Sequence, residues 1–332
     1  MAGYKEIKGF QVQTRTTDPT PYAQALADNP YAGAWSSGGS LNTARYANAG
    51  AGSQTAAISI AGSTAPPNNS NNVAIVEQYN GSSWTEVADL SASRWNASAA
   101  GTSTAVIAFG GAHPPGSAVQ TLNTYFNGSS WTELADLNTA RYVAAGTGTA
   151  YTAALCTGGA SPSGGDMDVV EQWDGSSWTE VAELNEGRSG TSSNIGTSTA
   201  ALAAGGSADP GAVPTVNVES WNGSAWTETG NLNQTRSQPG GSGLYTDAIV
   251  FGGYAPPGYL ANTESWDGSS WTEVADLANS RGDGAPAGTS SLLALYGGGN
   301  APGATSDTEE WSFQGLPPST PAADYADAIT GD

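Results

Sequence analysis

The fold of this chain is decided by the eleven-residue stretch NGSSWTEVADL at 80–90, which returns four times with small changes. The further copies are NGSSWTELADL at 127–137, DGSSWTEVAEL at 174–184, NGSAWTETGNL at 222–232 and DGSSWTEVADL at 267–277. A divergent copy, AWSSGGSLNTAR, carries Trp35. The six tryptophans of these copies lie 45 to 49 positions apart. A repeat of this period is typical of proteins built from stacked or radially arranged units.

Each repeat carries the signals of four short strands, which we name a to d. Strand a follows an arginine that stands ten positions after the repeat tryptophan, and strand b is an apolar run ending in Gly-Gly, such as AVIAFGG at 105–111. Strand c has the pattern Glu-x-aromatic, as in VEQYN at 76–80, and strand d contains the tryptophan. The Asn-Gly or Asp-Gly between c and d favours a tight hairpin, because such turns need positive φ. The arginines are Arg45, Arg94, Arg141, Arg188, Arg236 and Arg281.

The unit resembles the kelch repeat, in which Gly-Gly ends the second strand, an aromatic residue lies on the third and a tryptophan on the fourth. The resemblance covers residues 31–313 and implies an all-β kelch-type β-propeller. The chain enters this region with a lone d-type strand around Trp35 and leaves it with a lone c-type strand at 307–313. We therefore expect six blades, closed by pairing these two strands. An open solenoid, the alternative, would need polar capping repeats, and none is visible.

Composition excludes several classes of function. The 332 residues include 30 acidic and 9 basic side chains, for a net charge of −21, which disfavours nucleic acid and anionic membranes as partners. One cysteine and one histidine argue against a disulfide, a thiolate or histidine-rich metal centre and a histidine-based triad. We expect no cofactor and no metal. We also see neither a membrane-spanning apolar stretch nor a signal peptide.

Strand alternation places the d–a connections and the b–c loops on one face. The b–c loops differ in every repeat, whereas the c–d turns are nearly constant. Because binding residues concentrate on loops held by a rigid scaffold, we expect this face to bind; neutral drift of exposed loops would give the same variation. Aromatic rings near hydroxyls and amides suit sugar stacking, and packing under a loop is the alternative. The candidate ligand-binding residues are Tyr46, Trp95, Tyr142, His113, Tyr254 and Tyr259.

The repeated arginines permit two interpretations. A residue that is identical in every repeat is typically structural, so each arginine is expected to pair with a carboxylate. The alternative is a ring of positive charge that captures an anion such as a sialic or uronic acid. Candidate partners are the glutamates of strand c (Glu77, Glu171, Glu219, Glu264 and Glu309) or the acids before the repeat leucine (Asp89, Asp136, Glu183 and Asp276).

The chain ends differ from the repeats. Residues 1–30 hold the only other basic side chains, Lys5, Lys8 and Arg15, and residues 314–332 are rich in Pro, Ala and Asp. We expect an N-terminal anchoring arm and an extended C-terminal tail that lie outside the propeller.

The repeat sequences and the N-terminal sequence MAGYKEIKGFQVQT resemble those of kelch-repeat structural proteins of marine bacteriophages. This resemblance implies a non-enzymatic protein of the virion surface, located on the tail, a fibre, the collar or the capsid. Residues 1–30 would contact other virion proteins, and the variable face would bind a host-surface glycan or another virion protein. Two alternatives are a decoration protein without a receptor and a sialidase-like enzyme that processes glycans, which would need a pair of carboxylates.

Overall fold

The structure is a computed structural model that describes residues 33–65, 71–113, 118–208 and 213–313. Every regular element in these residues is a β-strand, so the prediction of an all-β chain is confirmed. Within the described residues, no helix is long and apolar enough to cross a membrane.

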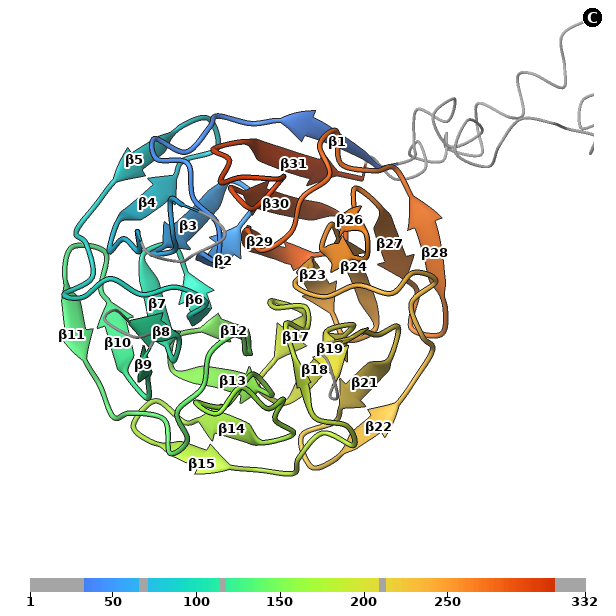
Figure 1. The fold of residues 1–332 in the computed structure, drawn as a ribbon, viewed down its shortest axis with the longest axis horizontal. Helices are drawn as coiled ribbons and strands as arrows, with labels where there is room; N and C mark the ends of the chain where they lie inside the picture. The colour runs from blue at the N-terminus through green and yellow to red at the C-terminus, as the bar shows by residue number, and fades with distance from the viewer. Residues whose placement is uncertain (1–32, 66–70, 114–117, 209–212, 314–332) are drawn as a thin grey trace, which may run out of the picture.

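Six four-stranded antiparallel sheets surround a central axis, a β-propeller-like arrangement (Figure 1). Strand a of each sheet lies nearest the axis and strand d at the rim (Figure 1). Five sheets follow chain order from axis to rim: β2 (Ala49–Ser53), β3 (Ala56–Ile60), β4 (Val76–Tyr79) and β5 (Trp84–Glu86); β6 (Ser98–Thr102), β7 (Ala105–Phe109), β10 (Asn123–Phe126) and β11 (Trp131–Glu133); β12 (Ala145–Ala150), β13 (Ala153–Thr157), β14 (Val170–Trp173) and β15 (Trp178–Glu180); β17 (Gly196–Thr197), β18 (Ala200–Ala204), β21 (Val218–Trp221) and β22 (Trp226–Glu228); β23 (Gly240–Leu244), β24 (Asp247–Phe251), β27 (Thr263–Trp266) and β28 (Trp271–Val274).

The sixth sheet takes its strands from both ends of the described chain. Its inner strands are β29 (Ala285–Ser290), β30 (Leu293–Gly297) and β31 (Thr308–Ser312). Its rim strand is β1 (Ala34–Ser37), which pairs antiparallel with β31 so that Trp35 lies opposite Trp311.

Two-residue strands lie in the segments that connect the strands of the six sheets. They are β8 (Ala112–His113), β9 (Ala118–Val119), β16 (Arg188–Ser189), β19 (Ser207–Ala208), β20 (Val213–Pro214), β25 (Tyr254–Ala255) and β26 (Gly258–Tyr259).

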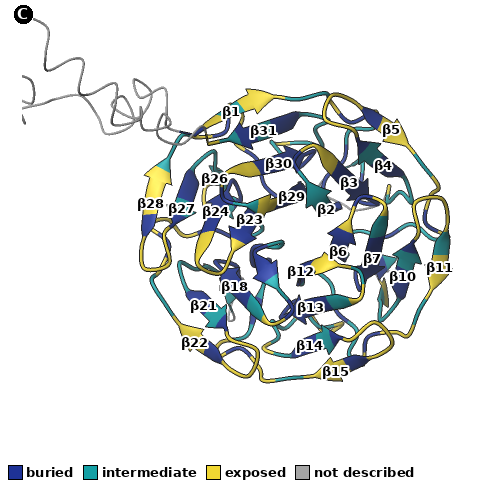
Figure 2. Ribbon diagram, turned by 180° about the vertical axis from the view of Figure 1, so that it is seen from behind, coloured by how far each residue is buried: buried dark blue, intermediate teal, exposed yellow. Residues whose placement is uncertain are grey.

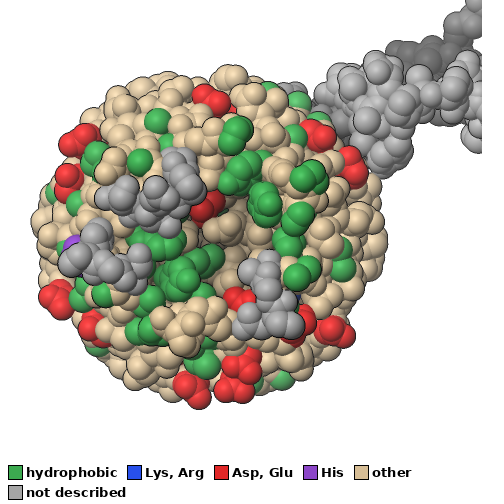
Figure 3. Space-filling model, viewed as in Figure 1, with side chains coloured by type: hydrophobic (Ala, Val, Ile, Leu, Met, Phe, Trp, Pro, Cys, Tyr) green, Lys and Arg blue, Asp and Glu red, His purple; other side chains and the backbone are tan. Residues whose placement is uncertain are grey.

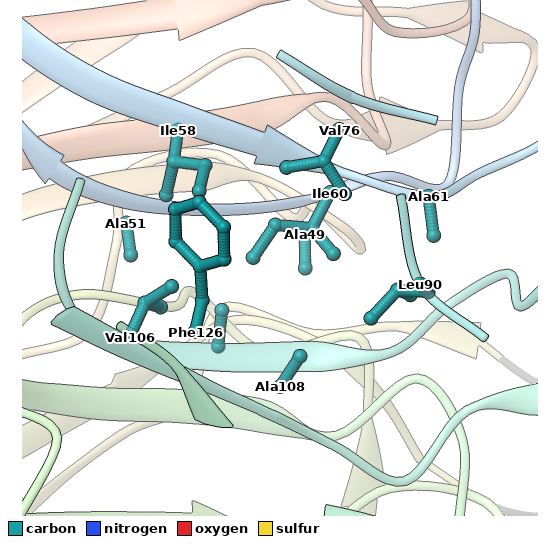
Figure 4. Close-up of a cluster of buried hydrophobic side chains, with 11 residues drawn as sticks. Ala49, Ala51, Ile58, Ile60, Ala61, Val76, Leu90, Val106, Ala108 and Phe126 are labelled. Atoms are coloured by element: carbon teal, nitrogen blue, oxygen red, sulfur yellow. The ribbon is translucent and has the colours of Figure 1, made fainter. Parts of the chain in front are cut away.

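The core lies between neighbouring sheets. In one cluster Ile58, Ile60 and Val76 of one sheet face Val106 and Phe126 of the next, and all are fully buried (Figure 4). Burial follows the same plan around the molecule, since the inner strands are largely buried and the rim strands largely exposed (Figure 2). Successive side chains along a strand point to opposite faces of its sheet, so each strand turns one set of side chains toward each neighbouring sheet.

The small residues after each arginine are explained by crowding at the axis. Strands a of adjacent sheets approach so closely there that a Cβ on Gly50 of β2 would collide with the carbonyl oxygen of Pro286 in β29. The small-residue stretch of each repeat is therefore a requirement of the geometry.

The c–d hairpin turns are fixed by a repeated hydrogen-bond pattern. Asp174 Oδ1 accepts hydrogen bonds from the backbone amides of Ser177 and Ser176, both at 2.8 Å, while Gly175 has a φ of 97°. Hydrogen bonds from Ser177 and Ser176 lower the pKa of Asp174 to about 2. Where asparagine replaces the aspartate, as at Asn80, its side-chain oxygen accepts the same two bonds.

Five of the six repeat arginines form buried ion pairs with the glutamate of strand c. The Nη–Oε distances are 2.6 Å for Arg45–Glu77 and 2.7 Å for Arg141–Glu171, Arg188–Glu219 and Arg236–Glu264, and Arg281 pairs with Glu309 in the same way. The acids before the repeat leucine have another role: Asp89, for example, accepts a hydrogen bond from the backbone amide of Val76.

The sixth arginine, Arg94, has a different partner. It is equally buried, but β10 carries Thr124 where the other c strands carry glutamate, and Arg94 Nη2 donates to Thr124 Oγ1 at 2.8 Å.

We predict that Glu171→Ala strongly destabilises the protein. The substitution leaves the guanidinium of Arg141 buried without its counter-charge, and breaking such a pair costs about 3–5 kcal/mol. The measurement is the urea midpoint of unfolding, followed by tryptophan fluorescence. Glu180→Ala on the exposed rim of the same sheet is the matched control and should change stability by less than about 0.5 kcal/mol. Equal losses in the two variants would contradict a structural role for the pair.

Candidate functional site

The face that carries the b–c loops has a central hollow with hydrophobic side chains gathered around it, whereas acidic side chains lie mainly toward the rim (Figure 3). The residues that line a cavity at the axis stand just before strand a or at its start in every repeat. They were not singled out by the sequence analysis.

Six backbone hydrogen bonds form a closed circle around the axis. Its members, which we call the axial ring, stand two positions after each repeat arginine, and each amide donates to the carbonyl oxygen of the member before it. The last carbonyl, that of Asp283, accepts from the first amide, that of Ala47, at 2.6 Å. The other bonds measure 2.7 to 3.1 Å. The members are Ala47, Asn96, Val143, Gly190, Gln238 and Asp283.

All six members of the axial ring have positive φ, between 51° and 62°. Five of them are not glycine, and for a β-branched residue such as Val143 this conformation is strained. The ring hydrogen bonds and the packing of the sheets hold this geometry in place. No residue preference marks these positions, so they could not be recognised from the sequence.

The axial ring opens onto a cavity of about 60 Å³, room for about four to six water molecules. Asn48 and Thr191 also line it, and among the described residues the buried atoms Asn48 Oδ1 and Thr191 Oγ1 have no hydrogen-bond partner. The cavity is therefore polar and suited to water or to a small hydrogen-bonding group.

The side chain of Asn194 reaches the strands of two other sheets. Its side-chain amide donates to the carbonyl oxygens of Gly50 at 3.0 Å and of Pro286 at 2.8 Å, while its backbone amide donates to Gly146 at 3.0 Å. One side chain from the segment before β17 thus joins two sheets on the other side of the axis.

Asp283 supplies the carboxyl group of the axial ring. Burial raises its pKa to about 7, and we find no hydrogen-bond donor to its carboxyl among the residues that the structure describes. Burial, together with the nearby charge of Asp283, raises the pKa of Tyr259 to about 12. The carboxyl therefore changes its charge close to neutral pH, beside phenol groups that keep their protons.

The structure brings four of the six predicted ligand-binding residues together in two pairs. Trp95 and Tyr142 make an edge-to-face contact with ring centroids 5.5 Å apart, and Tyr254 and Tyr259 make another at 5.4 Å. Within the described part of the chain, the indole Nε1 of Trp95 has no hydrogen-bond partner.

The other two predicted residues are placed differently. Tyr46 is 5% exposed, and its backbone pairs with that of Ser63 in the following b–c loop. His113 is half-buried, with Nδ1 at 2.6 Å from the carbonyl oxygen of Ser93. The predicted anchor residues Lys5, Lys8 and Arg15 lie outside the described residues.

Metal and thiol chemistry have little support in the described part of the chain. Its residues contain no group of three or more His, Cys, Asp or Glu side chains that could hold a metal ion. Cys156 is buried in β13, and burial raises the pKa of its thiol to about 12, so the thiolate nucleophile is disfavoured.

We predict that Asp283→Asn removes a pH dependence of stability. The folded protein keeps the Asp283 proton up to about pH 7, whereas the unfolded chain releases it near pH 4, so this group destabilises the fold progressively as pH rises between these values. The variant should match the parent at pH 4 and be more stable at pH 8, by at most about 4 kcal/mol and less where cavity water solvates the carboxylate. Asparagine tolerates the positive φ.

The measurement is urea unfolding of parent and variant from pH 4 to pH 9. Asp247→Asn, an equal charge change at an exposed position, is the control and should leave the pH dependence intact. Parallel profiles for the parent and Asp283→Asn would show that the carboxyl is not the cause.

Comparison with known proteins supports the fold. No protein-family model matches the chain, and no curated protein sequence matches it. A solved structure described as the structure of YjhT matches with a TM-score of 0.66 and 15% sequence identity, over 81% of this chain and 95% of that chain. At this identity the likeness concerns the fold alone, and it agrees with the β-propeller-like arrangement of the sheets.

Proposed function

We propose that this chain is a six-bladed kelch-like β-propeller that serves as a non-enzymatic binding module on the surface of a bacteriophage particle. The blade number is supported by the six four-stranded sheets and by the axial ring of six members. Closure by the two ends is supported by the pairing of β1 with β31. The kelch and phage assignments rest on the resemblance of the repeats and of the leader.

The observation that carries the binding role is the pair formed by Trp95 and Tyr142. These half-buried rings stand directly before Asn96 and Val143 of the axial ring, so they adjoin the central hollow. Aromatic rings beside amide and carboxyl groups suit a sugar, which presents C–H faces and hydroxyls. We assign this face to a glycan of the host surface.

The charge pattern around the hollow favours a neutral glycan. All six arginines of the described residues are buried beneath the face, and Asp283 is the only charged member of the axial ring. A strongly acidic polymer would meet a carboxyl there without an accessible counter-charge.

The non-enzymatic assignment rests on how the carboxylates are used. The strand-c glutamates are committed to buried ion pairs, and a single carboxyl belongs to the axial ring. Glycoside hydrolysis needs two carboxyl groups about 5–10 Å apart on either side of a bond. A sialidase-like enzyme is the alternative, and release of fluorophore from fluorogenic sialosides or galactosides would establish it against this proposal.

We predict that Trp95→Ala and Tyr142→Ala each weaken glycan binding by roughly tenfold, since each removes one ring of the pair and a lost aromatic contact costs about 1 kcal/mol or more. Binding would be measured on a glycan array and then by calorimetry with the best neutral ligand. Tyr245→Ala, which removes an exposed aromatic ring from the a–b turn of another sheet, is the matched control and should bind as the parent does. Absence of binding to every glycan would favour a decoration protein instead.

We also propose that residues 1–30 attach the propeller to other virion proteins. This segment carries Lys5, Lys8 and Arg15, and it lies outside the described residues. Deletion of residues 1–20 should prevent incorporation into particles, which can be assayed by immunoblotting purified virions. Incorporation at the parental level would exclude this arm as the anchor.

A further inference from the structure

Four of the repeats hold a glutamate carboxylate in the same set of donors, which we call the carboxylate socket. In one of them Glu171 Oε1 accepts from Arg141 Nη2 at 2.7 Å and from the Thr139 amide at 3.1 Å. Its Oε2 accepts from the Asn138 amide at 2.8 Å and from the Asn138 side chain at 2.9 Å. Arginine, the linker amide and the asparagine side chain serve Glu77, Glu219 and Glu264 in the same way.

A fifth repeat keeps the essential part of the socket. Glu309 pairs with Arg281 and accepts from the backbone amide of Ala278 at 2.7 Å. The asparagine is replaced by Ala278, so the arginine and the backbone amide suffice to hold the carboxylate. In five repeats of the chain, the socket therefore holds a carboxylate.

The sheet of β6, β7, β10 and β11 has the donors of the socket without the acceptor. Thr124 stands at the glutamate position and is too short to reach the linker. Ser91 and Ala92 occupy the linker positions whose amides bind glutamate elsewhere, and neither amide has an acceptor among the described residues. Arg94 is 2% exposed, and among the described residues its guanidinium bonds only to Thr124 Oγ1 at 2.8 Å and, at 3.4 Å, to the Leu122 carbonyl oxygen.

The missing side chain leaves a cavity of about 230 Å³. Arg94, Ser91 and Ala92 line one part of it, and Leu90 and Trp131 line another. Trp131 is half-buried, whereas its equivalents Trp84, Trp178, Trp226 and Trp271 are only 5% or 6% exposed. The cavity therefore reaches solvent at the rim strand and offers an apolar wall beside the donors.

Among the described residues, Arg94 has no buried counter-charge, and the nearby Asp136 is exposed. Burial lowers its pKa to about 10, so the guanidinium still carries its charge at neutral pH. A buried charge without a partner is unfavourable, and an anion that enters the cavity would relieve that cost. Guanidinium groups bind planar carboxylates through parallel hydrogen bonds.

We propose that this vacant socket binds the carboxylate of a small acidic ligand from solution, with the rest of the ligand against Trp131. An arginine and a linker amide are also the donors that hold Glu309, so a carboxylate suits the donors that remain here. Glu133 also lines the cavity and is exposed at its mouth, and a dianion such as phosphate would be repelled more strongly than a monoanion. The proposal goes beyond the glycan-binding face and does not depend on it.

The first test titrates the full-length protein with sodium propionate and, in a separate arm, with sodium glucuronate, by calorimetry at constant ionic strength. Sodium chloride is the control anion. We expect saturable 1:1 binding of propionate with no equivalent heat from chloride. Stronger binding of glucuronate would identify a uronic acid as the source of the carboxylate, and stronger binding of propionate a free organic acid. No saturable binding of either ligand, or an equal response to chloride, would overturn the proposal.

The decisive variant is Thr124→Glu, which supplies the missing carboxylate from the chain itself. We expect it to reduce propionate binding at least tenfold and to raise the melting temperature. Thr179→Glu, which adds the same charge on an exposed rim strand of the next sheet, is the matched control and should bind like the parent. Unchanged propionate binding in Thr124→Glu would refute the assignment.

Two further variants keep the test independent of how Thr124→Glu folds. Glu133→Gln removes the negative charge at the mouth and should tighten propionate binding about twofold or more. Glu171→Ala should create a second vacant socket, so propionate should raise its melting temperature more than that of the parent. Failure of both effects would contradict the proposal. Because Trp95 and Tyr142 are untouched in all these variants, the outcome is separate from that of the glycan test.

Discussion

The buried ion pair between the repeat arginine and the strand-c glutamate is the interaction on which the rest of the molecule depends. Arg141 lies in the linker that connects the previous sheet to the sheet of β12–β15, and Glu171 lies on the third strand of that sheet. The same glutamate also accepts from the linker amide, so one carboxylate fixes the position at which the chain enters each sheet. A buried charge pair is weak evidence for stability, but its geometry is demanding, and it fixes the register of the five repeats that have it.

The axis imposes the second constraint. Directly after each arginine the chain turns into the axial ring, where Val143 and Gln238 adopt positive φ that their side chains disfavour. Six residues can take this conformation together because each completes a hydrogen bond with its neighbour, so no single position can relax alone. The strained φ values and the closed circle of hydrogen bonds therefore depend on each other. The same arrangement exposes the side chains of the axial ring to the cavity, where residue identity is free to vary from Gly190 to Asp283.

Much of this organisation could be predicted from the sequence, because repetition shows which positions share an environment. The Asn-Gly and Asp-Gly turns predicted the c–d hairpins, and the Glu-x-aromatic pattern predicted the third strands. The partner of the arginines remained open between two sets of acids, since spacing does not show which carboxylate a long side chain reaches. The axial ring could not be predicted, because positive φ at Val143 follows from tertiary closure against local preference. The contact between Trp95 and Tyr142 likewise depends on how far two neighbouring sheets are rotated.

The exception at Thr124 is visible in the sequence, since NTYF at 123–126 breaks the glutamate pattern. Its meaning is not visible there, because a threonine could equally accompany a repacked arginine. Only the structure shows that Arg94 stays in the socket and that the space is left open to solvent. Under our proposal, a repeat protein acquires a binding site by losing one side chain from a structural motif, and the copies that keep this side chain indicate that the ligand group is a carboxylate. The positive charges of the described chain are all buried, so access to one of them through a cavity is selective in a way that an exposed arginine is not.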